Sequence, residues 1–193
     1  MDLWSYLAEN FDLPILDWIA ANIHCDFLDF LMPKITLLGD AGIFWIAVAV
    51  ALLFFPKTRK TGLAMGTALI MGLLVCNLTL KPLVGRIRPY DYQLEHFNVM
   101  IPLLIERQHD FAFPSGHTIA SFEAATVLFL NNKKWGSAAL VLAALIAFSR
   151  LYLYVHYVTD VLASLVLGIG FAFLANYLVG KGFTAWENRK LQN

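Results

Sequence analysis

Three groups of polar residues lie in parts of the sequence that are otherwise apolar. They are Lys81-x6-Arg88-Pro89, Pro114-Ser115-Gly116-His117 and Ser149-Arg150-x5-His156-x3-Asp160. Lysine and arginine supply fixed positive charge, and a helix N-terminus, where the second group is expected to lie, favours an anion. Histidine carries protons near neutral pH and can also act as a nucleophile. Together these residue types predict a site that holds a phosphoryl group and transfers it.

The spacing suggests a role for each group in that chemistry. His156 and Asp160 are four residues apart, so on a helix they share a face and the carboxylate can hold one imidazole nitrogen. If His156 attacks phosphorus, His117 can protonate the departing oxygen. The phosphoryl oxygens would be bound by five residues: Lys81, Arg88, Ser115, Gly116 and Arg150.

Most of these residues also have a simpler structural interpretation. A basic residue at a helix end, such as Lys81 or Arg86, can extend to a lipid headgroup. The Pro-Ser-Gly segment can be a turn with Ser115 as N-cap, and His156 can be a neutral core histidine. For Arg86, a solvated loop charge and a contact with a second phosphate are equally good interpretations.

Arg150 is harder to explain structurally. It lies well inside an apolar run, where an arginine costs at least ~2.5–3.5 kcal/mol. A functional role is therefore favoured over a structural ion pair with Asp160 or Glu123. Glu123 itself is eight residues beyond Ser115, and its role stays open.

The composition indicates a membrane protein of one domain. Of the 193 residues, 59% are hydrophobic and 15% are charged, whereas soluble domains carry about 25% charged residues. The 14 basic and 14 acidic residues give a net charge of +0, which argues against a nucleic-acid partner. Two cysteines, Cys25 and Cys76, are too few for a disulfide framework.

Long apolar stretches must form the helices that position the polar groups. They run from about Thr36 to Phe55, Gly62 to Leu80, Ser115 to Leu130 and Ser137 to Val179. The last has 43 residues, about 64 Å as one helix at ~1.5 Å per residue, which is enough for two crossings. A turn is expected near Tyr154 to Thr159, with Thr159 as a helix cap. We therefore predict an all-α transmembrane bundle of five to six membrane helices.

The first 35 residues are predicted to form an amphipathic segment at the membrane surface, with a short sixth crossing over residues 27–38 as the alternative. Residues 36–180 then form the catalytic domain, with an outer loop at 81–114, and residues 181–193 form a basic tail. Basic residues at 56–60, 131–134 and 181–190 fall on one side if the loops alternate. Lysine and arginine favour the cytoplasmic side, so the 81–114 loop is expected on the extracytoplasmic face of the cytoplasmic membrane.

The three motifs resemble, in order and spacing, the signature motifs of the type 2 phosphatidic acid phosphatase (PAP2) family, which is related to the vanadium haloperoxidases. The matching region extends from about Gly62 to Val179. The resemblance implies a phosphohydrolase that uses no metal or other cofactor and forms a phosphohistidine intermediate. It makes His156 the nucleophile, oriented by Asp160, and His117 the general acid. The phosphate-binding set that it implies is Lys81, Arg88, Ser115, Gly116 and Arg150.

Among the lipid phosphates that the family takes, we favour undecaprenyl diphosphate, because the short chain and its opening segment from Leu28 to Asp40 look similar to small bacterial members. Phosphatidylglycerol phosphate and phosphatidic acid are alternatives, since the motifs contact the phosphoryl group and not the tail. A phosphotransferase would use the same residues. A non-catalytic lipid-phosphate binder or a transporter is disfavoured, because binding alone needs neither a nucleophile nor an acid.

Overall fold

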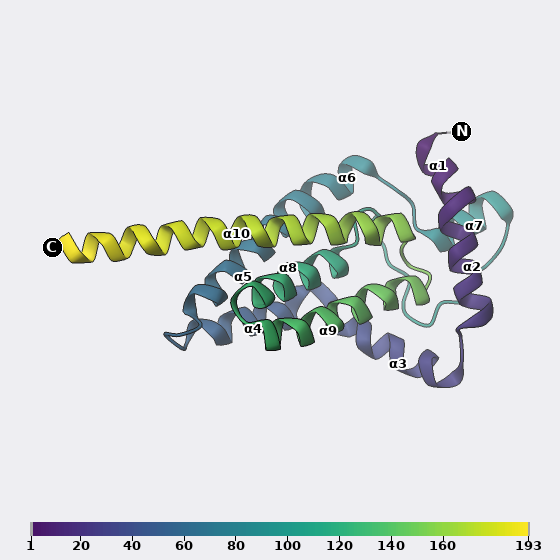
Figure 1. Cartoon of the computed structure of the whole chain (residues 1–193). Coiled ribbons are helices and arrows are strands. Elements are labelled where there is room, and N and C mark those ends of the chain that lie inside the picture. The colour runs from purple at the N-terminus through teal and green to yellow at the C-terminus, as the bar shows by residue number, and fades with distance from the viewer. Residues whose placement is uncertain (1, 193) are drawn as a thin grey trace.

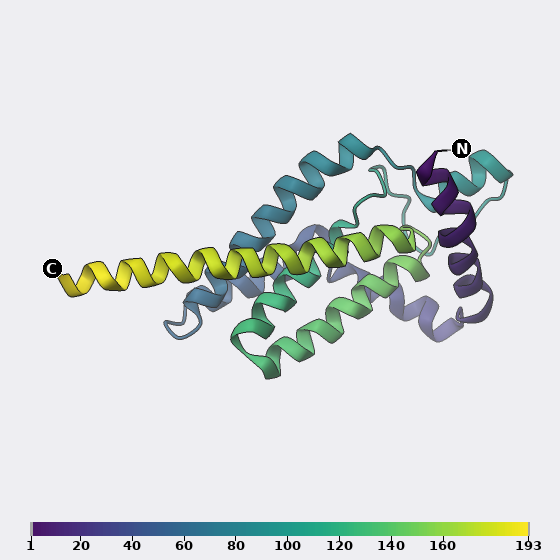
Figure 2. The same ribbon diagram turned by 45° about the horizontal axis from the view of Figure 1, so that its top comes forward.

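The computed structural model describes residues 2–192, and every element in that range is a helix (Figure 1). In chain order the elements are α1 Leu3–Leu7, η1 Ala8–Asp12, α2 Leu13–Asn22, α3 Asp26–Leu37, η2 Asp40–Gly42, α4 Ile43–Leu53, α5 Arg59–Gly72, η3 Leu73–Leu80, α6 Lys81–Val84, α7 Pro89–Phe97, α8 Gly116–Asn131, α9 Lys133–Tyr152 and α10 Val158–Gln192. The elements α1, η1, α2 and α7 lie across one end of the bundle, and α10 extends beyond the other (Figures 1 and 2). The chain is an all-α protein, as predicted.

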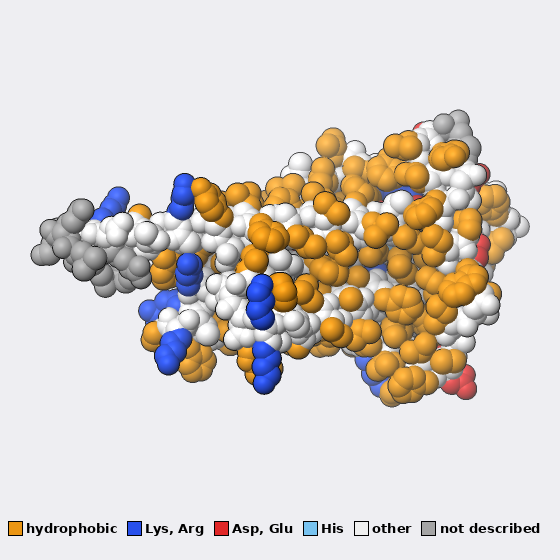
Figure 3. Space-filling model, in the orientation of Figure 1, with side chains coloured by type: hydrophobic (Ala, Val, Ile, Leu, Met, Phe, Trp, Pro, Cys, Tyr) orange, Lys and Arg blue, Asp and Glu red, His pale blue; other side chains and the backbone are white. Residues whose placement is uncertain are grey.

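Helix α8 lies at the centre of the bundle and packs against α5, α9 and α10. Small residues permit this close packing: Ala124 and Ala125 are fully buried, and a Cβ at Gly168 of α10 would lie 3.0 Å from the Ile119 carbonyl oxygen of α8. The outer surface of the bundle is covered by hydrophobic side chains (Figure 3). A central helix shielded on several sides is a rigid support for residues at its N-terminus.

Three helical stretches are long and apolar enough to cross a membrane: Arg59–Phe97, Lys133–Tyr152 and Val158–Ala185. The pair Asp26–Leu37 and Asp40–Leu53, bent by 42°, adds a fourth if it is one span. The predicted count of five to six is higher, because the apolar stretch that became α8 forms a helix of only 16 residues, shorter than the ~20 residues a hydrocarbon core needs.

The predicted turn inside the last apolar stretch is confirmed, since α9 ends at Tyr152 and α10 begins at Val158. Thr159 does not cap α10 as expected. Its backbone N–H donates instead to Asp12 Oδ1 at 2.8 Å, so a carboxylate from the N-terminal segment occupies the position of a cap. A negative charge at this end of a helix is favourable because the first N–H groups have no partner within the helix.

The N-terminal segment packs on the bundle with one face. Leu13, Leu16 and Ile19 of α2 are buried while Trp18 is exposed, so this helix has one buried and one exposed face. The location of the segment at the membrane surface stays a prediction. Residues 27–37 belong to α3 and Leu38 is its C-cap, and the boundary drawn between residues 35 and 36 falls inside that helix. Lysine and arginine side chains gather at the end of the bundle from which α10 extends (Figure 3).

Candidate active site

The three motifs meet at the end of the bundle opposite to the basic loops. They line a cavity of about 730 Å³ whose polar end is formed by Lys81, Arg88, Gly116, His117, Arg150 and His156. Lys81 begins α6, Arg88 precedes α7, Gly116 begins α8 and Arg150 lies in the last turn of α9. Residues separated by up to 75 positions in the sequence thus surround one space.

His156 lies in the connection between α9 and α10 and is almost fully buried. Its Nε2 atom is 3.4 Å from Arg88 Nη1, and the same guanidinium nitrogen donates to the Val155 carbonyl oxygen at 2.7 Å. Burial, followed by the charges of Arg88, Arg150 and Lys81, holds the pKa of His156 well below its ordinary value. The imidazole is therefore neutral at pH 7 and has a lone pair available for attack.

Asp160 stands next to His156, although not in the way the spacing suggests. His156 precedes α10, so the two residues do not share a helical face. Asp160 Oδ2 lies 3.5 Å from His156 Nδ1, which is longer than an ordinary hydrogen bond, and this nitrogen has no hydrogen-bond partner among the described residues. The same oxygen accepts the Tyr157 backbone N–H at 2.9 Å. Catalytic contacts of this kind often shorten only when substrate binds.

His117 faces the cavity from the first turn of α8 and contacts a carboxylate that the sequence did not point to. Its Nε2 atom lies 2.6 Å from Asp40 Oδ1 of η2 and 3.3 Å from Arg150 Nη1. Gly39 permits this approach, because a Cβ at that position would lie 2.6 Å from His117 Cδ2. Burial, followed by the charges of Arg150, Lys81 and Arg88, lowers the pKa of His117 to about 2, so the ring is neutral at pH 7 in the absence of an anionic ligand. Asp40 is placed to accept the hydrogen of a protonated Nε2.

Arg150 is buried at the polar end of the cavity. Its Nη1 atom donates to Thr36 Oγ1 at 2.6 Å, and neither Asp160 nor Glu123 forms an ion pair with it. The alternative of a structural ion pair is therefore wrong. The guanidinium keeps its charge beside the two histidines, where it can bind an anionic ligand.

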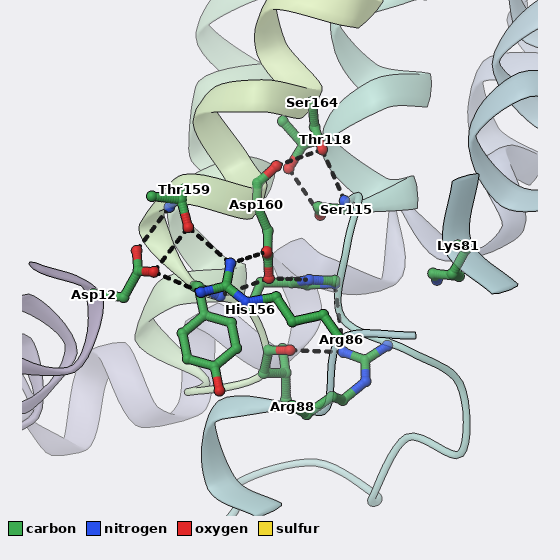
Figure 4. A network of polar contacts seen from close by, with 12 residues as sticks. Asp12, Lys81, Arg86, Arg88, Ser115, Thr118, His156, Thr159, Asp160 and Ser164 are labelled. Carbon is green, nitrogen blue, oxygen red and sulfur yellow. Dashed lines mark hydrogen bonds and ion pairs between the residues drawn. The ribbon is translucent and has the colours of Figure 1, made fainter. Parts of the chain in front are cut away.

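The N-terminus of α8 is formed as the Pro-Ser-Gly segment predicts, with Ser115 as the residue before the helix. The buried Ser115 donates its backbone N–H to Ser164 Oγ at 2.7 Å, and its Oγ accepts from Thr118 Oγ1 at 3.0 Å (Figure 4). Ser115 itself is fully buried and does not line the cavity, whereas Gly116 and His117 do. Gly116 and His117 place further backbone N–H groups at the same helix end.

Asp110, from the long outer loop, bridges two of the expected phosphate-binding cations. Its carboxylate pairs with Lys81 and accepts from Arg88 Nη2 at 2.5 Å. Burial acts to raise the pKa of Asp110, but the hydrogen bond from Lys81 and the charges of Arg88 and Lys81 outweigh it and lower this pKa to about 2. A lowered carboxyl pKa means that these ion pairs stabilise the fold above about pH 4 and are lost as the pH falls toward 2.

Because Asp110 is ionised at neutral pH and pairs with Lys81 and Arg88, it would compete with any phosphate that these two cations bind. We expect Asp110→Asn to tighten inhibition by inorganic phosphate several-fold at pH 7, with kcat little changed. Asp91→Asn is the matched control, since Asp91 pairs with Arg107 on the outer surface. The inhibition constant for phosphate measures the effect. An unchanged or weakened inhibition in Asp110→Asn would contradict the competition.

Arg86 is neither a solvated loop charge nor a contact for a second phosphate, so both interpretations from the sequence are wrong. Its buried guanidinium donates to Asp160 Oδ1 at 2.6 Å, to Asp12 Oδ2 at 2.8 Å and to Thr159 Oγ1 at 2.8 Å (Figure 4). It also lies over the ring of Tyr157 at 3.7 Å. Arg86 therefore approaches the site from behind Asp160, on the side away from the cavity.

Glu123 lies deeper in the same cavity, whose inner part is apolar. It is buried, and in the part of the chain that the structure describes neither carboxyl oxygen has a hydrogen-bond partner. It lies so close to Gly72 that a Cβ there would overlap the carboxyl group. The wall beyond it is formed by residues of α4 and α5: Ile46, Val50, Leu53, Leu63, Gly66 and Ile70. The site thus joins a cationic end to a hydrocarbon-lined groove.

Proteins named as lipid phosphatases resemble this chain in sequence, and one of them also resembles it in fold. The chain is 29% identical over 139 residues to an undecaprenyl-diphosphatase of Sulfolobus acidocaldarius, covering 72% of this chain and 65% of that protein. It is 33% identical over 183 residues to phosphatidylglycerophosphatase B of Bacillus subtilis, covering 88% of this chain and 76% of the relative. A crystal structure of the transmembrane PAP2 type phosphatidylglycerolphosphate phosphatase of Bacillus subtilis has a TM-score of 0.69 at 27% identity, covering 93% of this chain and 91% of that one.

The family assignment follows from a match to a family model. Residues 61–183 match the sequence profile of the PAP2 superfamily, and this range includes all three motifs and every residue of the cationic end of the cavity. The chain therefore belongs to the PAP2 superfamily.

Proposed function

We propose that this protein is an integral-membrane lipid phosphatase that hydrolyses undecaprenyl diphosphate to the monophosphate. Membership of the PAP2 superfamily and the phosphatase names of its relatives support a phosphoric ester hydrolase. The observation that carries the proposal is the cavity, because one end offers three cations and two histidines and the other end is apolar. A lipid can leave its tail in the groove while its phosphate reaches His156.

In the proposed first step, His156 Nε2 attacks phosphorus. An N–P bond to the terminal phosphorus forms as the bond from that phosphorus to the bridging oxygen breaks, and undecaprenyl monophosphate leaves. His117, which is protonated once the negative charge of the bound diphosphate offsets the neighbouring cations, gives its proton to that oxygen. Lys81, Arg88 and Arg150 neutralise the charge that develops on the other phosphoryl oxygens, which is where most of the acceleration in phosphoryl transfer arises.

In the second step, water attacks the phosphohistidine. His117, now neutral, accepts a proton from the water, the N–P bond breaks, and His156 is restored as inorganic phosphate forms. Asp160 holds the His156 ring through both steps. No metal ligand takes part in this scheme, so hydrolysis should persist in the presence of a chelator.

The proposed location is the cytoplasmic membrane, with the active site on its extracytoplasmic face. The basic loops at 56–60 and 131–134 connect α4 to α5 and α8 to α9 at the end of the bundle opposite to the polar end of the cavity (Figure 1), and lysine-rich and arginine-rich loops favour the cytoplasm. A cysteine introduced into the 81–114 loop should react with an impermeant reagent added to intact cells. Labelling only after cell lysis would contradict this orientation.

A second substrate, phosphatidylglycerol phosphate, is favoured by a specific observation. The relative of 33% identity and the structure of TM-score 0.69 both carry that name. The unpartnered carboxyl group of Glu123 in the groove also suits a lipid that brings a hydrogen-bonding group into the bilayer. We rank the isoprenyl diphosphate first because of the similarity to undecaprenyl-diphosphatases.

A substrate panel decides between these candidates. Purified protein with a chelator present should release phosphate from undecaprenyl diphosphate with a kcat/KM at least about tenfold above that for phosphatidylglycerol phosphate and phosphatidic acid, a difference of about 1.4 kcal/mol in transition-state binding. Equal rates would remove the preference for the isoprenyl substrate. Loss of all turnover with chelator would contradict the metal-independent mechanism.

A further inference from the structure

The surroundings of Asp160 connect the proposed nucleophile to the first residues of the chain. Asp12, Arg86 and Asp160 are all buried, at 0%, 5% and 0% relative exposure. Arg86 donates through Nη1 to Asp160 at 2.6 Å and through Nη2 to Asp12 at 2.8 Å. One guanidinium therefore bridges two carboxylates that are 148 residues apart in the sequence (Figure 4).

We propose that Asp12 and Arg86 are positioning residues for His156, acting through Asp160, and that the N-terminal segment Leu3–Asn22 is therefore part of the active site. This inference rests on the proposed role of His156 as nucleophile. The three sequence motifs do not indicate a positioning role for Asp12, because Asp12 lies outside all of them.

The geometry supports an orienting role for this bridge. Asp160 presents Oδ1 to Arg86 and Oδ2 to the Tyr157 N–H and to the side of His156 Nδ1. A carboxylate held at both oxygens cannot rotate freely, so its distance from the imidazole is fixed by the backbone of α10. Asp12 fixes that helix end as well, through the Thr159 N–H and hydroxyl at 2.8 Å each.

The charges explain why two carboxylates are needed. Arg86 paired with Asp160 alone would be neutral, and Asp160 would then have little negative field to offer His156. Asp12 brings the three groups to a formal charge of −1. That charge offsets the positive imidazole ring that results when Nε2 bonds to phosphorus and Nδ1 keeps its proton.

The groups that face the nucleophile fall into two sets. On the cavity side the charges of Lys81, Arg88, Arg150 and His117 act on His156. The carboxylates on that side pair with these residues and not with His156: Asp110 with Lys81 and Arg88, and Asp40 with His117. On the other side His156 faces Asp160, which in turn faces Asp12 and Arg86. Only the second set supplies negative charge from behind the ring.

The test compares the pH dependence of kcat for two variants of opposite charge change, with short-chain phosphatidic acid as substrate. Asp12→Asn removes a negative charge near Asp160 and His156. Protons then bind less readily to these groups, so the acid limb of the kcat profile should move to lower pH. Arg86→Gln removes a positive charge, so the acid limb should move to higher pH. In both variants kcat should fall roughly 10- to 100-fold, as for residues that support a catalytic group from behind, with little change in KM.

Asp17→Asn is the matched control, because Asp17 also ties the N-terminal segment to the bundle, through the Tyr154 hydroxyl at 2.6 Å, but does not touch Asp160 or Arg86. Its acid limb should not move. The inference is overturned if Asp12→Asn keeps the kcat and pH profile of the unmodified protein, if Asp17→Asn shows the same shift, or if Arg86→Gln and Asp12→Asn shift in the same direction. Should Arg86→Gln not fold, the comparison of Asp12→Asn with Asp17→Asn decides alone.

Detection of the phosphohistidine intermediate, beside the pH profiles, separates this inference from the proposed function. A phosphohistidine in the unmodified protein that is lost in His156→Ala, together with a normal Asp12→Asn profile, would overturn the positioning role and leave the mechanism in place. No phosphohistidine in the unmodified protein would instead contradict the proposed mechanism.

Discussion

His156→Ala should lose phosphate release by about 10⁴-fold or more, the range that follows removal of a nucleophile from a group of residues that act as a unit. The reason is geometric, since Nε2 of this buried ring faces Arg88 in the cavity. Phosphoenzyme trapped by an alkaline quench should disappear in the variant, while binding of the lipid phosphate remains.

The matched control for this change is His109→Ala, because His109 is an exposed histidine of the outer loop. It should retain near-normal turnover. If His156→Ala kept more than a few per cent of the activity, or if the phosphoryl group were found on another residue, His156 would not be the nucleophile.

His117→Ala should show a second large effect, and its size should depend on the leaving group. Loss of a general acid lowers rates by about 10²–10⁴-fold when the leaving oxygen is an alkoxide or a lipid phosphate. An aryl phosphate such as para-nitrophenyl phosphate leaves without protonation, so the first step should be nearly normal. The later attack by water would still need the base, and nitrophenol should appear as a burst while phosphohistidine accumulates.

The control for the acid is His96→Ala, since His96 stacks on Tyr92 in α7 at 3.9 Å and does not line the cavity. It should show no burst. An equal loss on lipid and aryl substrates in His117→Ala, without accumulation of phosphoenzyme, would indicate that His117 serves binding and not proton transfer.

The candidate site could be predicted largely from the sequence because its residues break a strong pattern. An arginine inside an apolar run, as at position 150, is costly enough to require a reason, and three short motifs with fixed spacing identified the remaining residues. The fold class followed from composition in the same way. These inferences need only local sequence and the properties of a bilayer.

What the sequence could not supply were partners contributed by distant segments. Asp12, Asp40 and Asp110 each contact a motif residue, yet each lies in a stretch where an acidic residue is equally well explained by solvation. Arg86 has the same ambiguity, because its burial depends on where the N-terminal segment packs. No periodicity connects such residues, so only the three-dimensional arrangement shows them.

The groove between α4 and α5 has a consequence for how rates must be measured. Its wall includes side chains that are also exposed on the lipid-facing surface, among them Ile46, Leu63 and Ile70. A lipid can therefore enter sideways from the leaflet in which it is dissolved, without passing through water. The concentration that governs turnover is then the mole fraction of substrate in the bilayer or micelle, so diluting the substrate with inert lipid at constant bulk concentration should slow the enzyme.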